Sequence, residues 1–498
     1  MEQTIIVIPK PVSVRYTDGF FKCRGMPGIT GDAVFQQEIV TASGQQWGDF
    51  GARAEAGILC KKEAVFTDPD KASEGYKLHI GQDGITISAA TGAGCYHGLQ
   101  TLRQIFLSEN QGGVVTIPCA EIEDYPRFPF RGYMLDSARH FFPVPVIKKL
   151  MDAISLHHIN HFHWHLTDWQ GWRFPVRKYP LLAEIGQKIN RYETNSEGLY
   201  TVEDIKDLVS YAAARHIEII PEVEFPGHAG AALRAYPELL CEDGAETGVF
   251  CAGNDKLFDF AAGVFDALAE LFPSPYVHFG GDEVDYAHWE KCPRCRKRLT
   301  DLGLKTPREL QSWLTVKLAL MLEERGKTAI GWDEILENTE RYKLPANTVV
   351  MSWRGVEGGI EAAGLGHQVI MCPTNDGCYF NYKPWDSPEE MGVLGNPKEM
   401  RGLGMTPVIH TYQMDPVPPG MNETNAKLIL GGQGCLWTEE IRNGRVAEYL
   451  TFPKICALSE ALWTPKEQKD FNDFKERLKT HEKRLDVLDI LYYRGPLE

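Results

Sequence analysis

The stretch Val277-His278-Phe279-Gly280-Gly281-Asp282-Glu283 decides how the long C-terminal part of the chain folds. A short apolar run ends at two glycines, and two acidic residues follow directly. Similar short apolar runs recur along residues 133–436, separated by longer amphipathic segments. Because short strands that alternate with helices form parallel sheets, this pattern predicts an α/β fold.

Eight such strands can be placed along the chain. They are expected at Tyr133–Leu135, His161–His165, Ile217–Glu222, Val277–Gly280, Thr328–Trp332, Val349–Trp353, Gln368–Met371 and Leu428–Leu436. Eight strands with intervening helices predict a (β/α)₈ TIM barrel. We expect this catalytic domain to span residues 125–498 and to include a C-terminal helix.

The first 124 residues have a different pattern, which predicts a small α+β accessory domain. Strands are expected at Thr4–Ile8, Tyr76–Ile80, Ile85–Ser88 and Val114–Ile117, and a helix at Tyr96–Phe106. The segment Glu121–Phe130 is acidic and contains two prolines, so it is expected to be a linker.

The composition excludes several classes of partner. The 498 residues include 52 Lys plus Arg and 68 Asp plus Glu, for a net charge of −16. This charge opposes nonspecific binding to nucleic acid or to anionic lipid. No apolar run is long enough for a membrane segment. A polar, uncharged small substrate fits this surface better.

The twelve cysteines are spread thinly, so they do not define a disulfide framework. Two pairs stand out, Cys292 with Cys295 in a C-x-x-C motif and Cys241 with Cys251 across a short polar loop. A single C-x-x-C supplies only half of the four ligands that structural zinc takes. A local disulfide or free thiols are therefore favoured over a metal site, and no cofactor is expected.

The candidate site residues follow the strands, because the active site of such a barrel lies at the carboxyl ends of its strands. Asp282 and Glu283 come after the fourth strand, although acids are also common in solvated loops and at helix starts. Asp168 follows the second strand and His228 the third. Carboxylates and imidazoles at one rim are typical of proton-transfer sites.

Trp332, Trp353 and Trp437 lie at the ends of the fifth, sixth and eighth strands. A single tryptophan is by default a core residue. Three at one rim beside acids instead indicate a cage for a sugar ring. Arg139 and Glu439 are candidates for binding sugar hydroxyls, or alternatively form a structural ion pair.

Together these segments resemble the family 20 glycoside hydrolases, the β-N-acetylhexosaminidases. The resemblance covers residues 1 to about 475. It rests on six ordered motifs: Arg-Gly-Tyr-Met-Leu-Asp-Ser-Ala-Arg-His, His-Phe-His-Trp-His-Leu-Thr-Asp, Glu-Phe-Pro-Gly-His, His-Phe-Gly-Gly-Asp-Glu-Val, Gly-Trp-Asp-Glu and Leu-Trp-Thr-Glu.

The resemblance implies a substrate-assisted reaction, in which the acetamide oxygen of the sugar attacks C1 and an oxazolinium intermediate forms. Glu283 would be the general acid and base, and Asp282 would hold the acetamide. The substrate would be a glycan with a terminal β-linked N-acetylhexosamine.

The remaining roles that the resemblance implies concern substrate binding and proton affinity. Trp332, Trp353 and Trp437 would box the acetyl group, and Tyr379, or alternatively Tyr382, would donate to the acetamide oxygen. Arg139, Asn381 and Glu439 would bind hydroxyls. Asp168 and His228 would form a relay that tunes Glu283.

Two other functions stay open at this stage. One is an enzyme that releases a terminal disaccharide, as lacto-N-biosidases do, and the other is a carbohydrate-binding protein without catalysis. The first residues show no export signal, but relatives that digest glycans are commonly exported, so periplasmic or extracellular location is expected.

Overall fold

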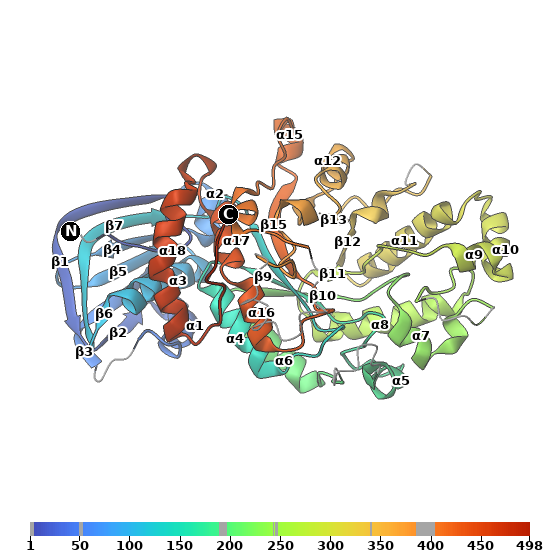
Figure 1. Cartoon of the computed structure of the whole chain (residues 1–498), viewed down its shortest axis with the longest axis horizontal. Coiled ribbons are helices and arrows are strands. Elements are labelled where there is room, and N and C mark those ends of the chain that lie inside the picture. Colours follow the sequence, from blue (N-terminus) through green and yellow to red (C-terminus); the bar gives the residue numbers. More distant parts are fainter. Residues whose placement is uncertain are drawn as a thin grey trace.

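The computed structural model describes residues 4–48, 53–188, 197–242, 244, 248–338, 341–384 and 404–498. Within these residues the chain forms an N-terminal sheet domain and a closed barrel, which lie side by side (Figure 1). The N-terminal domain contributes one apolar core and the barrel another.

The barrel consists of eight parallel strands in chain order. They are β8 (Phe130–Asp136), β9 (His161–His165), β10 (Glu218–Glu222), β11 (Tyr276–His278), β12 (Thr328–Trp332), β13 (Val349–Ser352), β14 (Val369–Met371) and β15 (Ile429–Leu436), which pairs with β8. Each lies within a few residues of its expected position. The predicted (β/α)₈ barrel is therefore confirmed.

Helices follow the barrel strands, and most of them cover the outer face of the barrel. They are α4 (Val144–Ser155), α5 (Leu181–Glu184), α6 (Val202–Ala213), α7 (Gly230–Ala235), α8 (Lys256–Leu271), α9 (Ala287–Lys291), α10 (Pro293–Leu302), α11 (Pro307–Glu323), α12 (Glu357–Gly364), α14 (Val408–Gln413), α15 (Glu423–Ala426), α16 (Gly444–Thr451), α17 (Lys454–Trp463) and α18 (Phe471–Val487). Because helices cover the outer face, strands such as β8 and β13 are buried along their whole length.

The N-terminal domain is a mixed sheet with helices on one face. Its strands are β1 (Ser13–Arg24), β2 (Met26–Gly31), β3 (Arg53–Lys62), β4 (Tyr76–Ile80), β5 (Ile85–Ala89), β6 (Asn110–Gln111) and β7 (Val114–Asp124), in the order β1-β7-β4-β5-β3-β2, with β6 on β7. The helices are α1 (Gln36–Ser43), α2 (Pro69–Glu74) and α3 (Gly92–Glu109). The predicted small α+β domain is confirmed, although β1, β2, β3 and β6 have no predicted counterpart.

Two local predictions in this domain are wrong. Thr4–Ile8 is not a strand, because the N–H and the C=O of Ile8 both bond to the side chain of Gln104 on α3. Glu121–Phe130 is not a linker throughout, because β7 continues to Asp124. Ile122 is buried there, whereas its two glutamate neighbours are partly exposed between β1 and β4, so the acidic segment alternates as a strand does.

The two domains are joined by buried polar contacts. Glu74 at the end of α2 pairs with Arg131 at the start of β8, and Trp463 of α17 donates from Nε1 to Oδ1 of Asp124 at 2.8 Å. The last helix, α18, lies along α3 of the sheet domain (Figure 1). Because these contacts are buried, the sheet domain provides a fixed support for the barrel.

Candidate active site

A pocket of about 210 Å³ lies at the carboxyl ends of the barrel strands. It is lined by Arg139, His228, Asp282, Glu283, Trp332, Trp353, Tyr379, Asn381, Tyr382, Trp437 and Glu439. The structure therefore brings the predicted site residues together around one pocket, except Asp168, which lies behind His228. Tyr382, the alternative to Tyr379, lines the pocket as well.

The turn after β11 places Asp282 and Glu283 at the pocket. Gly280 and Gly281 have φ angles of 72° and 104°, which favour glycine. A Cβ on Gly280 would overlap the carboxylate of Glu224. Asp282 is buried, whereas 60% of the Glu283 side chain is exposed to solvent. The turn therefore gives two consecutive acids different environments.

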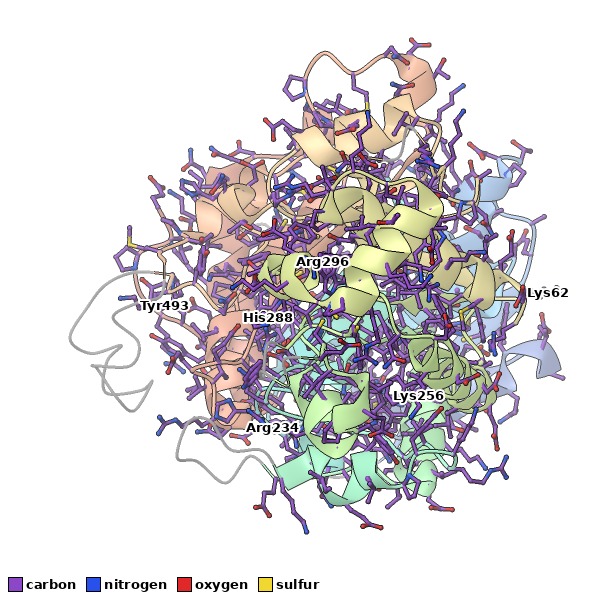
Figure 2. The ribbon with its side chains drawn as sticks, turned by 90° about the vertical axis from the view of Figure 1, so that its right-hand side faces the viewer. Lys62, Arg234, Lys256, His288, Arg296 and Tyr493 are labelled. Carbon is purple, nitrogen blue, oxygen red and sulfur yellow. The ribbon has the colours of Figure 1, made fainter. Side chains whose placement is uncertain are left out.

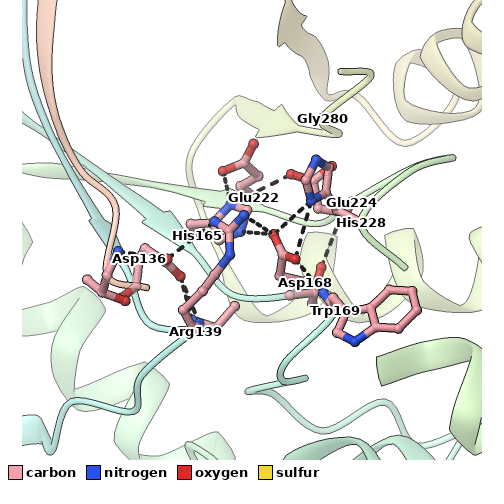
Figure 3. A network of polar contacts seen from close by, with 12 residues as sticks. Asp136, Arg139, His165, Asp168, Trp169, Glu222, Glu224, His228 and Gly280 are labelled. Carbon is pink, nitrogen blue, oxygen red and sulfur yellow. Dashed lines mark hydrogen bonds and ion pairs between the residues drawn. The ribbon is translucent and has the colours of Figure 1, made fainter. Parts of the chain in front are cut away.

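His228 contacts both of these acids. Its Nε2 lies 3.4 Å from Oε2 of Glu283 and 3.5 Å from Oδ2 of Asp282. On the other side of the ring, Nδ1 lies 3.3 Å from the carboxylate of Asp168, which also pairs with Arg139 at 2.9 Å. Figure 3 shows Asp168 between His228 and Arg139. These contacts form a row of alternately positive and negative groups, from Arg139 through Asp168 and His228 to Glu283.

This row of charged groups shifts the pKa values of its members. Burial raises the pKa of Asp282 to about 6. Burial lowers the pKa of His228, but the charges of Asp168 and Asp282 outweigh it and raise that pKa well above its usual value. The hydrogen bond from His228 then lowers the pKa of Glu283. Of His228 and Glu283, the imidazole therefore holds the proton.

Four aromatic rings form the opposite wall. Trp332 and Trp437 approach with ring centroids 5.8 Å apart, and Trp353 stacks on Tyr379 at 6.2 Å with an angle of 13°. Tyr379 also lies 6.4 Å from Trp437. The rings therefore form a continuous apolar surface facing the acids.

Two carboxylates fix the indole rings from behind. Nε1 of Trp332 donates to Oε1 of Glu222 at 2.9 Å, and Nε1 of Trp353 donates to Oε2 of Glu334 at 2.9 Å. Because both N–H groups are bound to these acids, the rings present carbon atoms to the pocket. Burial and the charge of Asp282 raise the pKa of Glu334 to about 8.

Arg139 and Asn381 supply polar groups at the pocket. Arg139 pairs with Asp136 at 3.3 Å, lies 3.7 Å from Glu439, and stacks over Trp437 at 4.9 Å. Oδ1 of Asn381 is buried and has no hydrogen-bond partner among the described residues. A ligand with hydroxyl groups would satisfy it.

Beneath the pocket, the carboxylate of Glu222 lies among three buried histidines. His278 lies 2.8 Å and His163 3.1 Å from its carboxylate, and His165 bonds to it too (Figure 3). This cluster fixes Trp332 through the same carboxylate. It places a carboxylate and three imidazoles in the buried interior of the barrel.

Sequence reasoning assigned no role to Asp136, Glu222 or Glu334, which hold Arg139, Trp332 and Trp353. Asp136 and Glu334 belong to quoted motifs and stand within three residues of a predicted binding residue. Glu222 ends a predicted strand but lies outside the motifs, so only its acidic character at a strand end could have indicated it. In contrast, Cys292 and Cys295 do not line the pocket.

Comparison with known families identifies the family of the chain. The model of glycosyl hydrolase family 20, domain 2, matches residues 4–125, and that of the family 20 catalytic domain matches residues 128–466. The chain belongs to glycosyl hydrolase family 20. The resemblance inferred from the motifs is confirmed, and this family 20 protein is a glycoside hydrolase.

Two curated relatives have related names. A beta-hexosaminidase of Porphyromonas gingivalis is 37% identical over 99% of this chain, which covers 65% of that relative's length. A beta-hexosaminidase of Akkermansia muciniphila is 33% identical over 83% of this chain and 84% of its own length. The family 20 chain thus spans about two thirds of the Porphyromonas relative.

Solved structures match over almost the whole chain. An exo beta-N-acetylglucosaminidase of Vibrio harveyi in complex with N-acetylglucosamine has a TM-score of 0.87 and 31% identity, with 98% of this chain and 78% of that chain covered. A beta-N-acetylhexosaminidase of Bacteroides fragilis has a TM-score of 0.84 and 29% identity, with 99% and 97% covered. Among the described residues of the family 20 chain, no helix has the length and apolar character to span a membrane.

Proposed function

We propose that this glycosyl hydrolase is an exo-β-N-acetylhexosaminidase, which removes terminal β-linked N-acetylglucosamine or N-acetylgalactosamine from glycans with retention of configuration. The observation that carries this proposal is that the carboxylates of Asp282 and Glu283 both approach the same nitrogen of His228, at 3.5 and 3.4 Å. One of these acids would then protonate the leaving oxygen while the other holds the acetamide group of the substrate. Family 20 enzymes are an exception to the rule of two catalytic carboxylates, so the acetamide oxygen would be the nucleophile.

The aromatic wall supports an acetamide nucleophile. Trp332 and Trp353 present ring carbons to the pocket, and Trp437 lines it beside them, so the three rings would hold the methyl of a 2-acetamido group. A carbonyl oxygen held against C1 in this way gains the rate advantage of an intramolecular reaction. Tyr379, next to Trp353 and Trp437, is placed to donate its hydroxyl to that carbonyl.

Asp282 would stabilise the positive charge that develops as the carbonyl attacks. Its Oδ1 is buried and has no hydrogen-bond partner among the described residues, so it is available to accept the acetamide N–H. A fixed carboxylate beside a developing oxazolinium ion stabilises the transition state more than the ground state. Asp282 must be ionised for this role.

Glu283 would protonate the leaving oxygen and then activate water. Its side chain is largely exposed, and the hydrogen bond from His228 lowers its pKa. A bound sugar would exclude water from Glu283, and desolvation raises the pKa of a carboxyl. Asp168 and His228 then set how readily Glu283 holds its proton.

Arg139, Asn381 and Glu439 would bind the hydroxyls of one terminal sugar. Their side chains line the same small pocket as the aromatic wall. A pocket of this size suits an exo-acting enzyme better than one that cuts within a chain. The V. harveyi neighbour, named an exo enzyme and solved with N-acetylglucosamine, supports the same assignment.

The test compares matched aryl glycosides that carry or lack the 2-acetamido group. We expect rapid hydrolysis of the N-acetylglucosaminide or N-acetylgalactosaminide and almost none of the glucoside, with competitive inhibition by a thiazoline mimic of the oxazoline. Equal hydrolysis of the glucoside would contradict an acetamide nucleophile. Release of intact disaccharide would favour a disaccharide-releasing enzyme, and sugar binding without turnover would favour a binding protein.

A further inference from the structure

Four cysteines from two separate loops converge beside the barrel. Sγ of Cys251 lies 3.5 Å from that of Cys295 and 3.8 Å from that of Cys292, and Sγ of Cys241 lies 3.9 Å from that of Cys295. All four sulfur atoms lie within 4.8 Å of one another. The C-x-x-C motif and the other cysteine pair, each half a site in the sequence, thus meet in one cluster.

We propose that Cys241, Cys251, Cys292 and Cys295 form a structural zinc site. Zinc bound by four thiolates is tetrahedral with Zn–S bonds of about 2.3 Å, so its sulfur atoms are separated by about 3.8 Å. The three measured distances, from 3.5 to 3.9 Å, bracket that spacing. These three distances match the edges of a Zn(Cys)₄ tetrahedron.

Two disulfides are the alternative, and the arrangement of the sulfur atoms argues against them. A disulfide brings two sulfur atoms to about 2.05 Å and separates them from other thiols. Here Cys251 contacts both Cys292 and Cys295, and Cys295 contacts both Cys241 and Cys251. Two of the four sulfur atoms thus contact two others each, as expected around a shared central ion.

The local backbone favours thiolates at this position. Cys292 is the N-cap residue of α10 and Cys295 lies in its first turn, where unpaired N–H groups stabilise negative charge. A Cβ on Gly253 would overlap the backbone of Arg294 and Cys295, so only glycine allows the two loops to approach this closely. Arg294 also donates from Nη2 to the carbonyl of Leu240 at 2.8 Å.

The site is closed to solvent. Cys251 and Cys295 are 0% exposed, and Cys241 and Cys292 only 4% and 3%. Four protein ligands leave no coordination position for substrate, which distinguishes structural from catalytic zinc. The ion would therefore connect parts of the fold and take no part in hydrolysis.

The zinc ion would connect the two loops that carry His228 and Glu283. One loop follows β10 and holds His228, and the other follows β11 and holds Glu283. Phe250, next to Cys251, donates its N–H to the carbonyl of Pro226 at 2.9 Å and accepts from Nε1 of Trp289 at 2.9 Å. Figure 2 looks onto this end, where α10 with Arg296 lies above α7 with Arg234.

Metal analysis of the purified chain tests this proposal. After expression in zinc-supplemented medium, we expect one zinc per chain by elemental mass spectrometry, and almost none in Cys251→Ser or Cys295→Ser. The matched control is Cys119→Ser, which changes a buried thiol in the sheet domain and should retain one zinc. Wild-type protein without zinc would overturn the proposal, whether its four thiols were free or paired as disulfides.

A second measurement does not depend on the variants folding. Wild-type protein unfolded, stripped of metal and refolded with Co²⁺ should show the visible bands of tetrahedral cobalt and the charge-transfer bands of thiolate ligands. Hydrogen exchange on the metal-free protein should increase in α9 and α10 and in residues 248–254, but not in the N-terminal sheet. Unchanged exchange in the two loops would overturn the connecting role.

Discussion

Nε2 of His228 lies 3.4 Å from Oε2 of Glu283, and both residues adopt left-handed backbone conformations, with φ of 50° and 47°. Non-glycine residues seldom hold such angles, and where they do, the surroundings enforce them. Gly227, beside His228, packs against the carbonyl of Asp282, where an added Cβ would lie at 2.9 Å. The imidazole is thus fixed against the carboxylate that we propose as the general acid.

Replacement of His228 by asparagine should move the pH profile of kcat/KM to higher pH. The imidazolium lies near both Asp282 and Glu283 and favours their ionised forms. Its loss raises both pKa values, so both limbs of the profile shift upward, by about 1 pH unit or more for an opposite charge at this distance. Asparagine tolerates the left-handed conformation, so the turn is preserved.

The control for this measurement is His79→Asn, which changes an exposed histidine on β4. Its pH profile should coincide with that of the wild type. If His228→Asn lowered kcat/KM equally at every pH, without shifting the profile, His228 would not set the pKa values of the two acids.

Glu283→Gln should abolish cleavage of substrates with poor leaving groups. Glutamine fills the same space but cannot donate a proton, and general acid catalysis contributes roughly 10²- to 10⁴-fold in rate. With aryl glycosides whose leaving group needs no protonation, the loss in the first step should be much smaller. The measurement is kcat across a leaving-group series, with exposed Glu290→Gln as the control. An equal loss across the series would contradict the acid role.

The sequence predicted the barrel strands well because each apolar run is short and ends at polar residues. The residues that follow such runs, Asp282, His228 and Trp437, could be placed at one rim for the same reason. What supports them could not be foreseen, because Glu334 meets Trp353 only after two neighbouring strands pair in register. Sequence spacing does not report such contacts.

The cysteines and the N-terminal strands illustrate the same limit. Cys251 and Cys295 are 44 residues apart, and only the meeting of two loops makes them neighbours. β1 is exposed along most of its length, so it lacks the apolar alternation by which strands are recognised. The sequence pattern therefore predicts a helix or strand best where one of its faces is buried against a neighbouring helix or sheet.

Glu334→Gln should leave activity almost unchanged at neutral pH, whereas Glu334→Ala should lower kcat/KM about tenfold. Because its pKa is about 8, Glu334 is mostly protonated at neutral pH, and glutamine mimics that form and still accepts from Trp353. Alanine removes the acceptor, and a lost hydrogen bond of about 1.4 kcal/mol corresponds to a factor of ten. Kinetics of both variants at pH 7 test this, and a large loss in the glutamine variant would mean that the charge is required.

Glu74→Gln should lower the melting temperature by several degrees, because it leaves buried Arg131 without its charged partner at a cost of about 3 kcal/mol. Burial raises the pKa of Glu74, but Arg131 and His97 lower it far more, so its stabilisation is present above the unfolded pKa of about 4.3 and is lost as pH falls further. Calorimetry should therefore show a smaller difference from wild type below about pH 4 than at pH 7. The exposed pair of Glu123 and Lys77 supplies the control, since Glu123→Gln should change stability by roughly 0.5 kcal/mol or less. If both substitutions lowered the melting temperature equally, the buried pair of Glu74 and Arg131 would not be what stabilises the contact between the domains.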